Sequence, residues 1–202
     1  MLSLEEAFIC LSPARGQSEE EVESFMYNIA IGICKIKVLK VSIGSLWDLY
    51  CLLTRPGCFS YSFNDLKYLK IRGTELGEHL QGIICLLKIS PNLENLFIDF
   101  EEVLESSDFG PLQDENITCL TYHLKVVQIN YVDDIENHLE LVRFLPQNAH
   151  VLEKMVVVWQ KSIEEIREAM EEVMEFPRSS SDAAVLHFGS QRDMGEFYKL
   201  EI

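Results

Sequence analysis

The sequence predicts an α/β fold, a leucine-rich-repeat-like solenoid arc with parallel strands on its concave side and helices on its convex side. Two observations predict it. A strand template of the form Leu-x-x-Leu-x-Leu recurs six times with conservative substitutions, and the segments between the copies change to the 3.6-residue period of amphipathic helices. Each strand–helix unit has one apolar face that it cannot bury alone, so stacking the units joins these faces into one core.

The six copies of the template begin at residues 4, 36, 66, 93, 124 and 152, so neighbouring copies are 27 to 32 residues apart. This spacing is near or above the long end of the usual repeat length of roughly 20–29 residues. Parallel strands that are joined through helices are expected to cross over with a right hand. We expect the equivalent template positions to point into the core, namely Leu66, Leu69, Leu93, Leu96, Leu124 and Leu152.

Helices are expected between the strands, on apolar stripes that run from Val22 to Ile33, Leu46 to Leu53, Leu76 to Leu87, Ile135 to Val142 and Ile163 to Val173. Capping boxes at Ser18 and Ser162 open two of them. Prolines predict where three of them end, at Pro91, Pro146 and Pro177. Residues 101–115 are expected to form an acidic loop, and residues 183–188 a final edge strand.

The clearest unit spans residues 119–159, where two short apolar strands flank one amphipathic helix. A strand–helix–strand unit of this kind pairs its two strands in parallel, because parallel neighbours need a crossover connection. The stretch Cys119–Leu124 is interpreted as the entrance to the first of these strands. Near this entrance, His123 could activate Cys119 as a thiolate nucleophile. We expect instead that the two residues have separate structural roles.

Composition excludes several classes of function. The chain has 17 basic and 33 acidic residues and a net charge of −16, which argues against nucleic-acid and anionic-membrane partners. No apolar run approaches the roughly 18 residues of a membrane span. The start lacks the basic residues of a signal peptide, and six cysteines without Cys-x-x-Cys spacing are typical of reduced thiols. We therefore expect an intracellular protein, cytoplasmic or nuclear.

No catalytic constellation is visible in the sequence. It has no Gly-x-Ser-x-Gly elbow, no His-Glu-x-x-His motif, no phosphate-binding loop and no dinucleotide fingerprint. The acidic pairs at 101–102 and 133–134 lack the order of a calcium loop and are interpreted as solvated loop charge. We expect no enzymatic activity, no cofactor and no metal.

A candidate protein-binding surface follows from strand alternation, because residues that flank the second template leucine point away from the core. An aromatic pair among polar neighbours is typical of the centre of an interface. The candidate residues on three successive strands are Tyr68, Lys70, Arg72, Asn95, Phe97, Asp99, Val126, Gln128 and Asn130.

Several segments together resemble the FBD region, and the repeat that precedes it, in plant proteins that join an F-box to leucine-rich repeats. They are residues 63–73, 86–96, 123–127, 140–145, 151–155 and 176–181. With the repeats, the resemblance implies a leucine-rich-repeat region over 1–115 and an FBD-like region over 116–188 that continues the same solenoid. The polar residues 189–202 are expected to form a flexible tail. No F-box is visible, so we expect part of a longer F-box protein or a short relative of one.

The resemblance implies the substrate-recognition part of such proteins, which binds a protein partner. A cullin-ligase adaptor would be a partner only if an F-box lies upstream. Two alternatives stay open: a small-ligand receptor or uncharacterised enzyme with a pocket in the repeat loops, and a truncated relative without a partner.

Overall fold

The structure is a computed structural model that describes residues 5–9, 32–42, 62–73, 79–100, 116–132, 136–161, 164–175, 177–181 and 183–188. Several predicted features lie outside the described residues. These are the helical stripes over 22–31 and 46–53, the capping-box serines, the acidic loop and the tail over 189–202.

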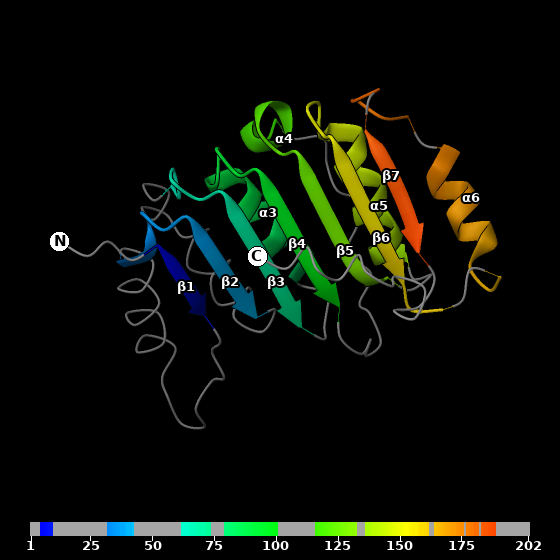
Figure 1. Cartoon of the computed structure of the whole chain (residues 1–202), viewed down its shortest axis with the longest axis horizontal. Helices are drawn as coiled ribbons and strands as arrows, with labels where there is room; N and C mark the ends of the chain where they lie inside the picture. Colours follow the sequence, from blue (N-terminus) through cyan, green and yellow to red (C-terminus); the bar gives the residue numbers. More distant parts are fainter. Residues whose placement is uncertain are drawn as a thin grey trace.

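The described residues form one sheet of seven parallel strands, whose order in space equals their order in the chain. Figure 1 shows the strands side by side. They are β1 (Glu6–Ile9), β2 (Val38–Ser42), β3 (Tyr68–Gly73), β4 (Asn95–Phe100), β5 (Val126–Val132), β6 (Lys154–Trp159) and β7 (Ala184–Phe188). The predicted α/β class with parallel strands is confirmed, and so is the final edge strand.

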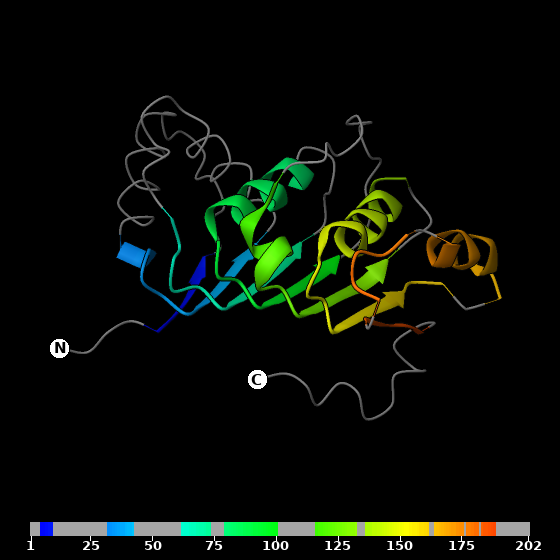
Figure 2. The ribbon, with the colours of Figure 1, turned by 90° about the horizontal axis from the view of Figure 1, so that it is seen from above.

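The described helices are α3 (His79–Ile89), α4 (Thr118–Tyr122), α5 (Glu136–Asn148) and α6 (Arg167–Glu175). They lie on one side of the sheet (Figure 2). Crossovers of one hand that always step in the same direction place their helices on the same side, which explains the arrangement. We call this side the helix face. The opposite side, which presents Tyr68 and Lys70 of β3 and Val156 of β6, is the second face.

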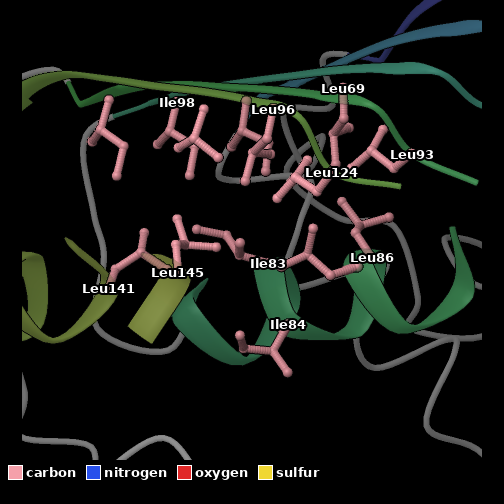
Figure 3. Packing of buried hydrophobic residues seen from close by; sticks show 14 of the residues in the cluster. Leu69, Ile83, Ile84, Leu86, Leu93, Leu96, Ile98, Leu124, Leu141 and Leu145 are labelled. Atoms are coloured by element: carbon pink, nitrogen blue, oxygen red, sulfur yellow. The ribbon is translucent and has the colours of Figure 1, made fainter. Parts of the chain in front are cut away.

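The core lies between the helix face of the sheet and the helices. The six template leucines that the sequence placed in the core are at most 1% exposed, which confirms that prediction. In Figure 3 the strand residues Leu69, Leu96 and Ile98 point toward Ile83 of α3 and Leu141 of α5. Burying a side chain of this size stabilises a fold by about 1.5–3 kcal/mol. The repeat template therefore marks the positions that hold strand and helix together.

The predicted end of α5 at Pro146 is wrong, because the helix continues to Asn148 with Pro146 inside it. Proline lacks an N–H, so its position cannot donate to the carbonyl one turn earlier. The turn that follows is held by two other bonds: the Ala149 N–H donates to the Leu145 carbonyl at 2.9 Å, and Asn148 Nδ2 donates to the Phe144 carbonyl at 2.9 Å. Buried packing at this end outweighs the local proline signal.

The predicted strand entrance at Cys119–Leu124 is also different, since Thr118–Tyr122 form the short helix α4. Threonine and tyrosine favour strands locally, so the sequence pattern hides this turn. Tertiary contacts fix it: the Cys119 Sγ lies 3.3 Å from the Leu87 carbonyl, and the His150 N–H donates to the Leu120 carbonyl at 3.0 Å. At the other end of the chain, α6 begins at Arg167, later than the predicted cap at Ser162. Val173 of α6 and Ile166 just before it are buried, as the predicted stripe requires.

One extra residue interrupts β5. Ile129 pairs with Val157, but the next pair joins Val132 to Trp159, so three steps of β5 match two steps of β6. Tyr131 takes up the difference with φ of 61°, a left-handed conformation that is uncommon for a bulky residue. The bulge shifts the alternation of side-chain directions along β5 by one residue. As a result, Val132 and its partner Trp159 are both fully buried in the core.

Charged residues immediately precede each of the strands β1 to β6, and they pair across neighbouring strands. Lys37 bonds to Glu5 at 3.0 Å, Lys67 to Glu94 at 2.6 Å and Lys125 to Glu153 at 3.4 Å. These pairs link β1 to β2, β3 to β4 and β5 to β6. Because their side chains are well exposed, each pair contributes about 0.2–1 kcal/mol.

Candidate protein-binding surface

The registers of β3, β4 and β5 place the nine predicted surface residues in three adjacent rows on the second face. The rows are Tyr68–Asn95–Val126, Lys70–Phe97–Gln128 and Arg72–Asp99–Asn130. Neighbouring strands in a sheet are about 4.8 Å apart, so side chains in one row are in reach of each other. The structure thus brings the whole predicted set together.

Tyr68 and Phe97 form the apolar centre of this surface. They are diagonal neighbours on β3 and β4, and their rings stack with centroids 4.7 Å apart and planes inclined by 22°. Both side chains are half-buried. A stacked pair of this kind contributes about 0.5–1.5 kcal/mol beyond its buried area. The pair is fixed by the sheet before any partner arrives, so a partner would not have to order it.

A chain of polar contacts crosses the same three strands. Lys70 Nζ lies 3.1 Å from Asp99 Oδ2, Asn130 Nδ2 donates to Asp99 Oδ1 at 2.5 Å, and Gln128 Nε2 donates to Asn130 Oδ1 at 3.0 Å. The Lys70 and Asp99 side chains are only 23% and 13% exposed. Reduced access of water strengthens such contacts, so they hold the polar side chains in one arrangement.

The nine residues differ in how accessible they are. Asn130 is only 7% exposed and acts as a support for Asp99 and Gln128. On the next strand, Val156 and Val158 also belong to the second face and are 4% and 1% exposed. The second face is therefore buried at Asn130, Val156 and Val158, whereas Val126 and Gln128 of β5 are half-buried.

The structure adds three residues to the surface that the sequence prediction did not include. Phe8 of β1, which is 67% exposed, and Lys40 of β2 lie in the same row as Lys70. Glu6 lies in the row of Tyr68 and bonds to Lys40 at 2.6 Å. The first two copies of the template carried the signal, because these residues flank its second apolar position as Tyr68 and Lys70 do.

A separate hollow of about 360 Å³ lies between α4 and the end of α5. It is lined by Asn116, Ile117, Leu120, Thr121, Tyr122, Asn148 and His150. Its base is apolar and buried, whereas Tyr122 and His150 at its rim are exposed. In the part of the chain that the structure describes, this hollow is one candidate site for the alternative of a small-ligand receptor.

The thiol chemistry considered for Cys119 is not favoured by its surroundings. Burial raises the pKa of the Cys119 thiol to about 12, and burial also raises the pKa of Cys85. Reactive thiols need an exposed, electropositive setting that lowers the pKa instead. Among the described residues, no group of three histidine, cysteine or acidic side chains could hold a metal ion, and no helix is long and apolar enough to cross a membrane.

Residues 114–157 match the protein-family model FBD. The chain contains an FBD domain. This confirms the resemblance that the sequence segments carried. The match covers α4, β5, α5 and the first part of β6, and it includes every residue that lines the hollow as well as Val126, Gln128 and Asn130 of the second face. No curated protein and no solved structure shows a significant match to the chain.

Proposed function

We propose that the chain is a non-catalytic protein-binding module, similar in role to the substrate-recognition part of plant F-box/FBD/leucine-rich-repeat proteins. The sequential parallel sheet with helices on one side supports a leucine-rich-repeat-like solenoid whose second face is the concave side. The FBD match supports a role in protein interaction. The proposal includes an intracellular location and, when an F-box shares the polypeptide, coupling to a cullin ubiquitin ligase.

One observation carries the proposal. The second face presents an aromatic pair, Tyr68 and Phe97, together with the exposed Arg72 and a hydrogen-bonded polar network on the same three strands. Aromatic and arginine side chains dominate the binding energy of protein interfaces, and a rigid arrangement lowers the entropy cost of binding. The three rows combine these properties on a surface that no described helix covers.

The test is a pull-down from plant extract with three versions of the full chain. They are the wild type, the triple variant Tyr68→Ala/Arg72→Ala/Phe97→Ala, and the control variant Tyr122→Ala/His150→Ala at the hollow. Circular dichroism would first verify that all three are folded. We expect the triple variant to lose partners that the wild type and the control retain.

Two results would contradict the proposal. If the triple variant keeps every partner, the second face is not the recognition surface. If only the control variant loses partners, binding takes place at the hollow between α4 and α5, and the small-ligand or peptide pocket becomes the better explanation.

A further inference from the structure

The hollow between α4 and the end of α5 has the size of a small-molecule site. It lies at the edge of the sheet where the strands begin, since α4 leads into β5 and α5 leads into β6 (Figure 1). Its volume of about 360 Å³ is near the lower end of the roughly 300–1,000 Å³ that ligand pockets occupy. The hollow therefore suits a compact ligand of one or two rings.

Hydrogen bonds within the protein fix the shape of the hollow. The His150 N–H donates to the Leu120 carbonyl at 3.0 Å, which ties the loop after α5 to α4. Thr121 Oγ1 donates to the Ile117 carbonyl at 3.3 Å, and Asn148 Nδ2 donates to a carbonyl one turn earlier on α5 at 2.9 Å. Ile117 and Leu120 at the base are almost completely buried. The site is therefore formed before a ligand arrives, which lowers the entropy cost of binding.

The chemistry of the lining indicates which ligand it suits. Five of the seven lining side chains are polar and none is lysine, arginine, aspartate or glutamate, although a quarter of the chain is charged. A charged ligand would find no opposite charge among these side chains, and an apolar ligand would leave their polar groups without partners. Asparagine amides and tyrosine and threonine hydroxyls both donate and accept, as the hydroxyls of a ligand do. The lining thus favours an uncharged ligand that carries several hydroxyls.

The rim supplies an aromatic ring and unused hydrogen-bonding groups. Tyr122 is 65% exposed, and its ring meets the His123 ring at an inclination of 61°, with centroids 6.4 Å apart. Within the described part of the chain, the side chains of Asn116 and His150 make no hydrogen bond. The C–H groups on one face of a sugar ring pack against an aromatic face, whose partial negative charge attracts them. The rim can therefore hold both the apolar face and the hydroxyl edge of a sugar.

We propose that the hollow binds an uncharged sugar ring, either free or at the end of a glycan. One face of the sugar packs on Tyr122, and its hydroxyls bond to Asn116, Asn148 and His150. This site is separate from the second face, so the inference goes beyond the proposed function. A peptide fits less well, because common modes of peptide recognition use a sheet edge, an apolar groove or a cluster of charged residues, and the seven lining residues provide none of these.

The experiment uses the full chain and the methyl glycosides of glucose, galactose, mannose and N-acetylglucosamine. Saturation-transfer NMR identifies which of them bind, and titration gives the Kd. We expect at least one to bind. The same ring with a carboxylate or an amine, benzyl alcohol, and an uncharged peptide of serine and asparagine should each bind at least ten-fold more weakly. The proposal is overturned if no sugar binds, or if any of these comparison ligands binds as tightly as the sugar.

Variants then locate the site, after circular dichroism has verified that each is folded. Tyr122→Ala should weaken sugar binding at least ten-fold, whereas Tyr122→Phe, which keeps the ring, should weaken it less than three-fold. Met174→Ala on α6 is the control, because it also removes an exposed side chain but lies outside the lining, and it should change the Kd less than two-fold. Equal effects of Tyr122→Ala and Met174→Ala, or of the two Tyr122 variants, would contradict the proposed arrangement.

A tetrasaccharide that ends in the bound ring distinguishes the two sources of the sugar. Equal affinity supports the end of a glycan as the ligand, and at least ten-fold weaker binding supports the free sugar.

The outcome is separable from that of the pull-down. A glycoprotein that is captured through the hollow would be lost by the Tyr122→Ala/His150→Ala variant, while proteins captured through the second face would stay. If a sugar binds but the triple variant keeps every partner, this inference stands and the proposed function fails. If no sugar binds but the triple variant loses partners, the proposed function stands and this inference fails.

Discussion

Asn130 donates a hydrogen bond from its buried amide to the carboxylate of Asp99 on the neighbouring strand. Through this bond and the one that it accepts from Gln128, Asn130 ties β4 to the polar side chains of β5. The residue was predicted as part of a contact surface. The structure gives it a second role, which is to position Asp99 so that the carboxylate meets Lys70.

Replacing Asn130 by alanine should therefore reduce stability. The change removes a hydrogen bond to a charged group in a water-poor site, and we expect the free energy of unfolding to fall by about 1–3 kcal/mol. Asn95→Ala is the matched control, because its amide makes only a long 3.4 Å bond to the Lys67 carbonyl. Urea denaturation measures both. Equal losses in the two variants would show that Asn130 has no special supporting role.

Leu124 is a stringent test of the repeat register, because it is fully buried just before β5. Leu124→Ala should cost about 2–5 kcal/mol through lost burial and the cavity that remains. Met174→Ala on α6, where the side chain is 55% exposed, should change the free energy of unfolding by at most about 0.5 kcal/mol. A loss below about 1 kcal/mol at Leu124 would mean that this position does not belong to the core.

Cys119 should resist thiol reagents in the folded protein. With its pKa raised to about 12 by burial, the Cys119 thiol is almost entirely protonated at pH 8, and the side chain is also shielded from the reagent. Cys34, which is half-buried, should be alkylated before Cys119. Mass spectrometry after brief iodoacetamide treatment distinguishes the two sites, and labelling in denaturant shows that both can react. Rapid native labelling of Cys119 would contradict the buried position.

Glu94 should show a pH-dependent contribution to stability. The hydrogen bond from Lys67 lowers the pKa of the Glu94 carboxyl below its usual value. The contribution is therefore present above the ordinary carboxyl pKa and is lost as the pH falls through the lowered one. Because both side chains are more than one third exposed, it amounts to about 0.2–1 kcal/mol.

Lys67→Met should raise the pKa of Glu94 toward its ordinary value, as followed by NMR titration. Lys125→Met is the control, since Lys125 acts on Glu94 only through its charge and as a smaller cause. A larger rise in the Lys125 variant would show that the hydrogen bond from Lys67 is not the main cause.

The parts of the fold that the sequence predicted are those that depend on local periodicity. The six template leucines, of which Leu66 is the first and Leu152 the last, are buried. A parallel sheet covered by helices needs an apolar residue at each of these positions. The helix α4 was not predicted, since its threonines favour a strand and only contacts with Leu87 and His150 fix the turn. The end of α5 was misplaced for a similar reason.

For the candidate surface, too, features set by local periodicity were predicted and features set by contacts between strands were not. Alternation along β3 to β5 placed the nine residues on one face, because side-chain direction follows from the period of a strand. Burial of Asn130, by contrast, follows from neighbours on other strands and has no local pattern. The added residues Phe8 and Lys40 could have been predicted by applying the same rule to the first two repeats.

The arrangement of charged residues across the sheet predicts which two neighbouring strands separate first. Glu5 and Glu6 bond to lysines in or just before β2, and Lys67 and Lys70 bond to acidic residues in or just before β4. Across β2 and β3, Lys40 lies directly opposite Lys70. Like charges opposite one another weaken strand pairing. In hydrogen exchange, the Lys67 and Tyr68 amides, which donate to the Lys37 carbonyl, should exchange faster than those of Glu94 and Asn95, which donate to the Lys67 carbonyl. The sheet would then open first between β2 and β3, into a two-stranded piece and a five-stranded piece that keeps the whole FBD domain.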